Sequence, residues 1–209
     1  MSRSLRGPFT AALALILVPA FVSSASAALL DPSCSTAGPV IVGNASGKSY
    51  ASVGALSSVP GYAVVLGGPG CLPLAGQAVE LDFSKAYVRL FASQKPGTTV
   101  DCARQVLIKV TDESGVALFS PSFGGWVNEP SVQVTVDGVV LATVSARSTD
   151  MDADGTTGLT DLVRFSRLFL AESTYPDIDF NASGGKVDLA DFAIFASEFL
   201  DGTSGAYCP

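Results

Sequence analysis

A segment in the C-terminal third of the chain occurs twice, and this repeat is the strongest constraint on how the chain can fold. Residues 159–166 (LTDLVRFS) match residues 189–196 (LADFAIFA) when the sequence is shifted by 30 positions. In both copies apolar residues recur every third or fourth position, which is the spacing of one face of an α-helix. The stripes are residues 159, 162, 165 and 169 in the first copy and 189, 192, 195 and 199 in the second. The sequence therefore predicts two equivalent helices.

Regularly spaced aspartates precede the first of these helices. Three of them alternate with other residues, a glycine follows at the sixth position, and another aspartate stands at the twelfth. Calcium takes six to eight oxygen ligands, which a loop can supply when carboxylates point inward at alternate positions. Glycine at the sixth position permits a sharp turn. We predict a Ca²⁺ site formed by Asp150, Asp152, Asp154, Asp161 and the carbonyl of Thr156, with Gly155 at the turn.

The loop before the second helix departs from this pattern and fits two frames. In the first frame Asp191 is equivalent to Asp161, and one residue is inserted after the turn glycine, Gly184. The second frame starts at Asp177 and needs no insertion; Asp188 is then the twelfth residue, and Ala182 replaces the turn glycine. Both frames supply fewer carboxylates and predict a second, weaker Ca²⁺ site. We favour the first frame, and the candidate ligands across both are Asp179, Asn181, Ser183, Asp188 and Asp191.

The loop–helix repeat resembles a dockerin of type I. The features that it shares are an aspartate at the twelfth loop position, a helix after each loop and a strand-like segment before the first loop; they extend from Asp150 to Leu200. Dockerins attach exported proteins to cohesin domains of a scaffold, in assemblies that degrade polysaccharide. The resemblance thus implies a cohesin-like or other extracellular protein partner, and a connection with polysaccharide. The clostridial pattern has a Ser/Thr-type contact pair at loop positions 10 and 11, where this chain has Leu159-Thr160 and Leu189-Ala190.

The region before the aspartates reads as all-β, because short runs rich in Val, Ile, Tyr and Phe alternate with turn residues. Three such runs are residues 63–66, 86–91 and 106–110. Residues 131–144 predict a hairpin, since its valines alternate with polar residues and Asp137-Gly138 suits a type I′ turn. Regular short strands of this kind favour a β-sandwich.

Residues 109–119 (KVTDESGVALF) read as a strand, an Asp-x-x-Gly turn and a second strand. This segment resembles a hairpin of the bacterial immunoglobulin-like domains found in invasin-type adhesins. We therefore expect a multidomain fold: an all-β immunoglobulin-like sandwich followed by a small all-α, dockerin-like, paired EF-hand-type calcium module. The expected ranges are 28–148 for the sandwich, 149–203 for the calcium module and 204–209 for a C-terminal tail.

The first 27 residues have the features of a cleaved signal peptide: two arginines, an apolar stretch over residues 10–22 and small residues at 25–27. The apolar stretch is shorter than the roughly 20 residues of a membrane span. We thus expect a bacterial protein that is secreted or held at the cell surface, with no membrane span. An even number of cysteines in an exported chain predicts disulfides, with three pairings for four cysteines. Cys71–Cys102 is preferred because both residues lie in the first domain.

Charge and composition exclude several functions. Residues 150–209 carry eleven acidic and three basic side chains, which is the wrong sign for binding nucleic acid. The chain has no histidine, so Ser-His-Asp catalysis is excluded. Glycoside hydrolysis needs two carboxylates that flank a sugar; Glu80, Asp82, Asp101 and Glu129 are candidates but lie in no recognisable motif.

We accordingly expect a secreted, non-catalytic calcium-binding protein whose dockerin-like segment mediates attachment, and we expect that segment to fold only with calcium. The alternative is an adhesin or carbohydrate-binding protein in which the calcium module is purely structural. The lone tryptophan, Trp126, follows two glycines and could either stack on a sugar or belong to the core.

Overall fold

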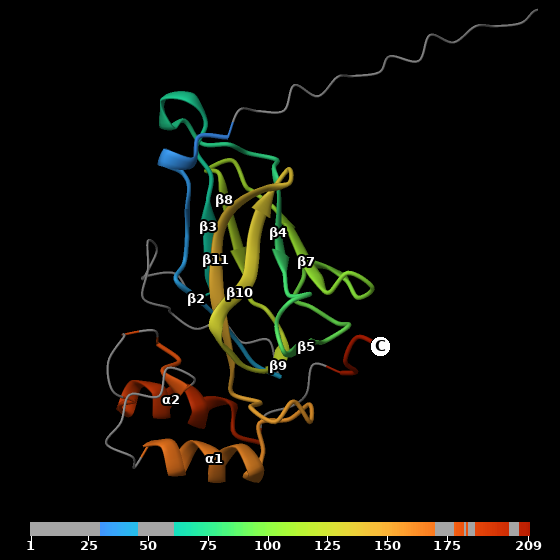
Figure 1. The fold of residues 1–209 in the computed structure, drawn as a ribbon, viewed down its shortest axis with the longest axis vertical. Helices are drawn as coiled ribbons and strands as arrows, with labels where there is room; N and C mark the ends of the chain where they lie inside the picture. Colours follow the sequence, from blue (N-terminus) through green and yellow to red (C-terminus); the bar gives the residue numbers. More distant parts are fainter. Residues whose placement is uncertain (1–29, 46–60, 170–177, 182, 184–186, 201–204) are drawn as a thin grey trace, which may run out of the picture.

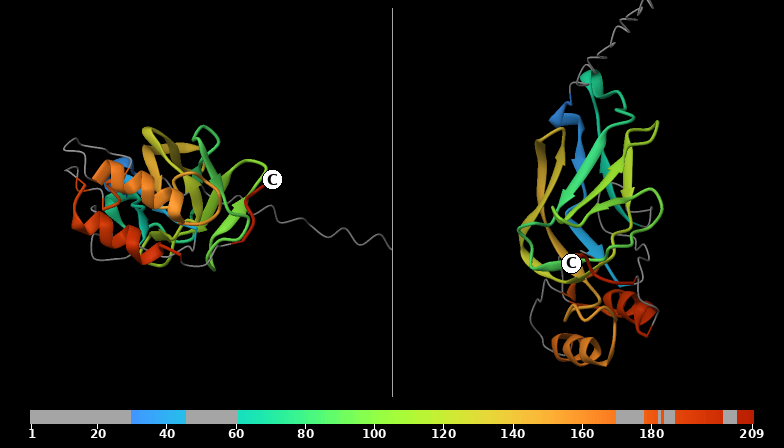
Figure 2. Two further views of the ribbon diagram at one scale, coloured as in Figure 1. Left: turned by 90° about the horizontal axis from the view of Figure 1, so that it is seen from below. Right: turned by 90° about the vertical axis from the view of Figure 1, so that its right-hand side faces the viewer.

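The computed structural model describes residues 30–45, 61–169, 178–181, 183, 187–200 and 205–209. Three sheets curl into a half-barrel, and two short helices lie at one end of it (Figures 1 and 2). In chain order the elements are η1 (Pro32–Cys34), β1 (Thr36–Ala37), β2 (Val40–Gly43), β3 (Tyr62–Val65), η2 (Pro69–Cys71), β4 (Ala78–Asp82), β5 (Val88–Leu90), β6 (Thr99–Asp101), β7 (Val106–Val110), β8 (Val116–Phe119), β9 (Phe123–Gly125), β10 (Val127–Val136), β11 (Val139–Ser148), α1 (Leu159–Phe169) and α2 (Leu189–Glu198).

The largest sheet is built around the predicted hairpin. Its strand order is β2-β11-β10-β4-β7-β6, while β1-β3-β8 and β5-β9 form the two smaller sheets. The valines at 132, 134 and 136 are buried, and Asp137 and Gly138 have φ of 48° and 79°, as a type I′ turn requires. The run predicted at 63–66 overlaps β3, and the runs at 86–91 and 106–110 contain β5 and β7. Residue type and turn signals therefore predicted these three strands correctly, and alternation predicted the hairpin.

Strand β2 separates two apolar clusters. Ile41 points into the main core, which fills the space between the sheets. Val40 and Val42 point the other way, into a second cluster that contains Phe165 of α1 and Phe195 of α2. Successive side chains of a strand face opposite sides of the sheet. All four residues of β2 are buried because both of its faces are covered.

The predicted fold class, an immunoglobulin-like sandwich followed by a small all-α calcium module, is wrong. Among the described residues the fold is mostly β, with three sheets in a curled half-barrel and only two short helices. The helices form no all-α module of their own, because their apolar faces are completed by Val40 and Val42 of β2. Short helices in water need such a tertiary surface to bury their apolar stripe.

The segment that carried the immunoglobulin-like resemblance contains the expected turn but forms no hairpin ladder. Gly115 N–H donates to the carbonyl of Asp112 at 2.9 Å, and Gly115 has φ of 75°. The flanking strands then separate: β7 pairs with β4 and β6, whereas β8 pairs with β3. The two strands thus belong to different sheets.

Two disulfides join Cys34 to Cys71 and Cys102 to Cys208. The preferred pairing of Cys71 with Cys102 is wrong, because the fold brings η1 against η2, where Asp31 N–H donates to the carbonyl of Gly67 at 2.9 Å. Two disulfides are typical of an extracellular or secreted protein. Among the described residues, neither helix is long and apolar enough to cross a membrane. The predicted signal peptide, residues 1–27, lies outside the described residues.

Candidate metal centre

The first aspartate loop connects the end of β11 to the start of α1. One carboxylate oxygen from each of Asp150, Asp152 and Asp154 lies within 4.8 Å of the others. Asp150 is fully buried, whereas the other two are exposed. Gly155 turns the loop with φ of 103°, a value that L side chains rarely adopt. The sequence spacing therefore brings three carboxylates together at a turn that glycine permits.

Asp161 closes this loop from the first turn of α1. Its Oδ1 accepts hydrogen bonds from Met151 N–H at 2.7 Å and Asp152 N–H at 3.2 Å, and its Oδ2 accepts one from Gly158 N–H at 2.8 Å. A single carboxylate thus connects the beginning and the end of the loop. Asp161 is only 1% exposed, so these bonds form out of water.

Burial sets the electrostatics of the loop. It raises the pKa of Asp150 to about 6; hydrogen bonds from Tyr207 and Gly155 oppose this shift, and the neighbouring Asp161 and Asp154 add to it. Burial likewise raises the pKa of Asp161, against the hydrogen bond from Gly158. A buried carboxylate among others is costly to ionise. A bound cation would relieve that cost.

The second loop repeats this hydrogen-bond pattern. Asp191 at the start of α2 accepts from Asn181 N–H at 3.0 Å and from Asp188 N–H at 2.9 Å. Ser183 N–H donates to Asp179 Oδ1 at 3.0 Å, as Asp154 N–H donates to Asp150 Oδ1 at 3.2 Å in the first loop. Burial raises the pKa of Asp191. Asp191, Asp179, Asn181 and Ser183 therefore occupy the places of Asp161, Asp150, Asp152 and Asp154.

Two predicted residues have other contacts in the described structure. The Asp188 side chain accepts hydrogen bonds from Ala190 N–H and Asp191 N–H, so it is the N-cap of α2. Thr156 is exposed, and its N–H and hydroxyl both donate to Asp154 Oδ1 at 2.8 Å. The alternative loop start and the turn glycine of the second loop, residues 177 and 184, lie outside the described residues.

The first aspartates of the two loops meet different partners, neither of which sequence reasoning identified. Tyr207, near the C-terminus, donates its hydroxyl proton to Asp150 Oδ2. Arg147 of β11 donates to the backbone carbonyl of Asp179, and its guanidinium lies 3.6 Å from Asp179 Oδ2. The only sequence signal for the position of Tyr207 was the adjacent Cys208, because a disulfide from this cysteine can hold the tail against the sheets.

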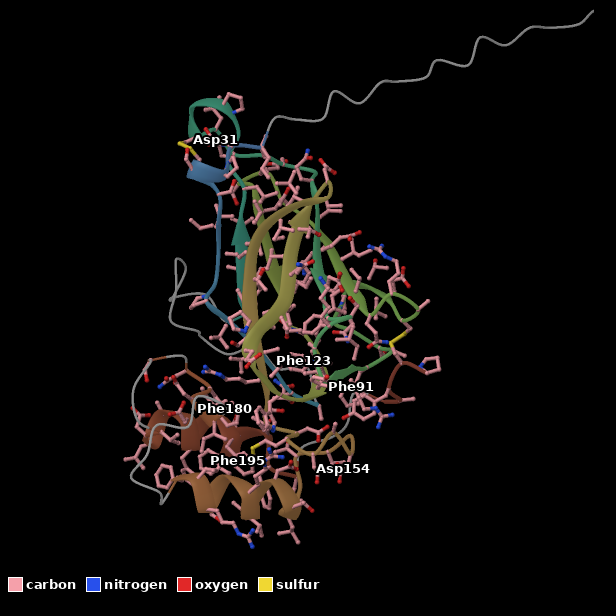
Figure 3. The ribbon with its side chains drawn as sticks, in the orientation of Figure 1. Asp31, Phe91, Phe123, Asp154, Phe180 and Phe195 are labelled. Carbon is pink, nitrogen blue, oxygen red and sulfur yellow. A yellow bond between two sulfur atoms is a disulfide. The ribbon has the colours of Figure 1, made fainter. Side chains whose placement is uncertain are left out.

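An apolar groove runs between the helices. It measures about 310 Å³ and is lined by Leu162, Phe165, Ser166, Phe169, Leu189 and Phe192. Phe165 and Phe195 stack with ring centroids 4.8 Å apart. Phe195 lies between the two helices in Figure 3, and Phe180 belongs to the same apolar cluster. The residues at loop position 10, Leu159 and Leu189, are 69% and 75% exposed.

Four other candidates from the sequence have structural partners, and the fifth, Glu129, is exposed. Trp126 is half-buried against the helical cluster, and the guanidinium of Arg164 lies 5.0 Å from its ring centre. Glu80 forms an ion pair with Arg104 at 2.8 Å, and Asp101 lies 3.9 Å from the same guanidinium. Asp82 accepts a hydrogen bond from Ser84 N–H at 2.8 Å.

Comparison with known proteins gives the chain no family: no family model, curated protein or solved structure matches it.

Proposed function

We propose that this is a secreted, non-catalytic calcium-binding protein, in which two loop–helix units hold Ca²⁺ and present their helices to an extracellular protein. The observation that supports this most strongly is the repeated hydrogen-bond pattern, in which Asp161 and Asp191 each tie the end of a loop to its beginning. Such a pattern gives each loop a fixed shape around its carboxylates.

The donor set of the first loop fits calcium. Its candidate ligands are all oxygens, and Ca²⁺ prefers six to eight hard oxygen ligands in flexible geometry. Asp150, Asp152, Asp154 and Asp161 would supply carboxylate oxygens, and Thr156 its carbonyl. Bound calcium neutralises the mutual repulsion of these groups, two of which are fully buried. Calcium binding would therefore stabilise the loop and the start of α1.

The second loop is proposed to bind calcium more weakly. It has two carboxylates, Asp179 and Asp191, where the first has four. The charge of Arg147 already balances Asp179 at 3.6 Å. Fewer anionic ligands and a competing cation both reduce affinity for Ca²⁺.

Calorimetric titration with Ca²⁺ after chelator treatment tests the proposal. The wild-type chain should show one tight and one weaker site. Asp152→Asn/Asp154→Asn should weaken the tight site by about tenfold or more, because affinity follows the number of charged ligands. Asp112→Asn is the matched control, since Asp112 heads an exposed Asp-x-Ser-Gly turn outside the loops. Absence of binding heat from the wild-type chain would contradict the proposal.

A cohesin-like domain is proposed as the partner, in an assembly that acts on polysaccharide. The leucines at position 10 of both loops are exposed, and Leu189 lines the apolar groove, where these side chains can contact another protein. Surface plasmon resonance with immobilised cohesin domains should show binding in Ca²⁺ and none in chelator. Leu159→Lys/Leu189→Lys should abolish it, while Val140→Lys, at a half-exposed valine beside the β10–β11 turn, should not. Failure to bind any cohesin would remove this partner and leave calcium binding untouched.

A further inference from the structure

The C-terminal residues 205–209 lie against the sheets, beside β5 (Figure 1). Tyr207 forms an antiparallel bridge with Phe91. Ala92 N–H donates to the carbonyl of Ala206 at 2.9 Å, and Cys208 N–H donates to the carbonyl of Leu90 at 2.7 Å. The tail is therefore held by backbone hydrogen bonds to the end of β5 and the residues after it.

Covalent and aromatic contacts fix the position of Tyr207 further. The next residue, Cys208, is bonded to Cys102, which follows β6. The ring of Tyr207 packs on Phe91 with centroids 4.3 Å apart, and the guanidinium of Arg89 lies 4.2 Å from its centre. These contacts direct the hydroxyl toward the first aspartate loop.

That hydroxyl donates to one oxygen of the Asp150 carboxylate, Oδ2. Asp150 Oδ2 accepts from Tyr207 at 2.5 Å and from Gly155 N–H at 3.0 Å. Asp150 Oδ1 accepts a hydrogen bond from Asp154 N–H at 3.2 Å. Two donors on one oxygen fix the carboxylate plane and leave Oδ1 as the oxygen for a ligand.

Gly124 of β9 makes this contact sterically feasible. A Cβ at this position would lie 2.1 Å from the Tyr207 hydroxyl and 2.5 Å from Asp150 Oδ2. The neighbouring Gly125 N–H donates to the backbone carbonyl of Asp150 at 2.7 Å. The two glycines before Trp126 therefore allow β9 to approach the loop closely.

We propose that Tyr207 is a positioning residue for the first calcium site, and that the Cys102–Cys208 disulfide holds it in place. This inference rests on the proposed calcium binding and adds a long-range control to it. Groups that hydrogen-bond a metal ligand fix its orientation, and their loss typically costs tenfold or more in metal affinity. The affinity of the first loop should thus depend on a tail 57 residues away in sequence.

The first test is calorimetric titration of Tyr207→Phe with Ca²⁺. Phenylalanine keeps the ring contacts with Phe91 and Arg89 and removes only the hydroxyl. We expect the tight site to weaken by about tenfold and the weaker site to keep its affinity. Tyr87→Phe, at a tyrosine that is 93% exposed, is the matched control. A purely structural role would lower the melting temperature in chelator without a selective change at one site.

The second test removes the disulfide. Cys102→Ser/Cys208→Ser should weaken the tight site at least as much as Tyr207→Phe, and adding Tyr207→Phe to it should cause little further loss. Additive losses would contradict the role of the disulfide. If the wild-type chain binds Ca²⁺ and Tyr207→Phe binds it with the same affinity, this inference alone is overturned. If the wild-type chain binds no Ca²⁺, the proposed function is overturned as well.

Discussion

At the scale of single residues, the two loops differ mainly in what faces their first aspartate. Asp150 meets a neutral hydroxyl donor, and Asp179 meets a guanidinium. A hydroxyl orients a carboxylate without cancelling its charge, so the carboxylate still attracts a cation. A guanidinium does cancel it, and the pair is stable without metal. The same backbone pattern can therefore serve one loop that depends on calcium and one that depends on it less.

The buried pair of Arg147 and Asp179 gives a first prediction. Both side chains are less than 10% exposed, so Arg147→Met leaves a buried carboxylate without its cation. We expect a loss of about 3–5 kcal/mol in the free energy of unfolding in chelator. The loss should be smaller in excess Ca²⁺, because the ion can neutralise Asp179. Urea unfolding under both conditions measures this.

The matched control is Arg104→Met, which breaks the exposed pair with Glu80. Its guanidinium side chain is 55% exposed, so the loss should stay below about 1 kcal/mol and should not depend on Ca²⁺. Equal losses for Arg147→Met with and without Ca²⁺ would contradict cation binding at the second loop.

Tyr62 gives a prediction about alkaline pH. Its hydroxyl donates to the carbonyl of Gly38 at 3.0 Å inside the core, and burial raises its pKa well above the usual value near 10. Above pH 10 the unfolded chain releases this proton while the folded chain keeps it, so stability falls as pH rises. Between pH 10 and 12 the wild-type chain should lose about 1.4 kcal/mol per pH unit more than Tyr62→Phe. Tyr87→Phe should follow the wild-type curve, and parallel curves for all three proteins would refute the prediction.

At the scale of elements, the N-terminus of α2 allows helix capping by Asp188 to be tested apart from metal binding at the second loop. Asp188 and Asp191 form a capping box, in which each side chain accepts from the other's backbone N–H. Asp188→Ala should lower the free energy of unfolding by about 1 kcal/mol, both in chelator and in Ca²⁺. Calcium affinity at the second loop should not change, since Asp188 faces the helix. Asp188→Ser should retain the cap, and a selective loss of calcium affinity in Asp188→Ala would favour the second frame.

The elements that sequence alone predicted are those with local causes. The valine alternation of β10 and the Asp137-Gly138 turn act between neighbours, as do the apolar stripes of α1 and α2. Strand and disulfide partners that lie far apart in sequence produce no local pattern that could predict them. β7 and β8 flank the predicted turn, yet they join different sheets, and Cys71 pairs with Cys34 rather than Cys102. In the candidate site the aspartate spacing predicted the loop residues. The roles of Arg147 and Tyr207 could not be predicted, because only the folded chain brings them to the loops.

At the scale of the whole molecule, the helices and the sheets both pack against strand β2. Ile41 belongs to the main core, while Val40 and Val42 belong to the helical cluster, so β2 is needed by both. The tail then crosses back to β5 and is bonded to Cys102. Cys102 and Cys208 are 106 residues apart in sequence. A disulfide that closes a loop of this length contributes about 4–5 kcal/mol to the free energy of unfolding. The aspartate loops, helices and sheets are thus connected at three places: β11, β2 and the tail.

This connection predicts that the C-terminal segment cannot fold by itself. Residues 149–203 contain Phe165, Phe180 and Phe195 but lack Val40 and Val42, which cover the same cluster. In saturating Ca²⁺ the isolated segment should show helical far-ultraviolet circular dichroism without a cooperative thermal transition, because its apolar face stays in water. The full chain should unfold cooperatively, and Val40→Ser/Val42→Ser should uncouple its helices, whereas Val139→Ser/Val140→Ser at the exposed β10–β11 turn should not. A sharp thermal transition from the isolated segment in Ca²⁺ would mean that calcium alone organises the two helices, and that β2 merely lies beside them.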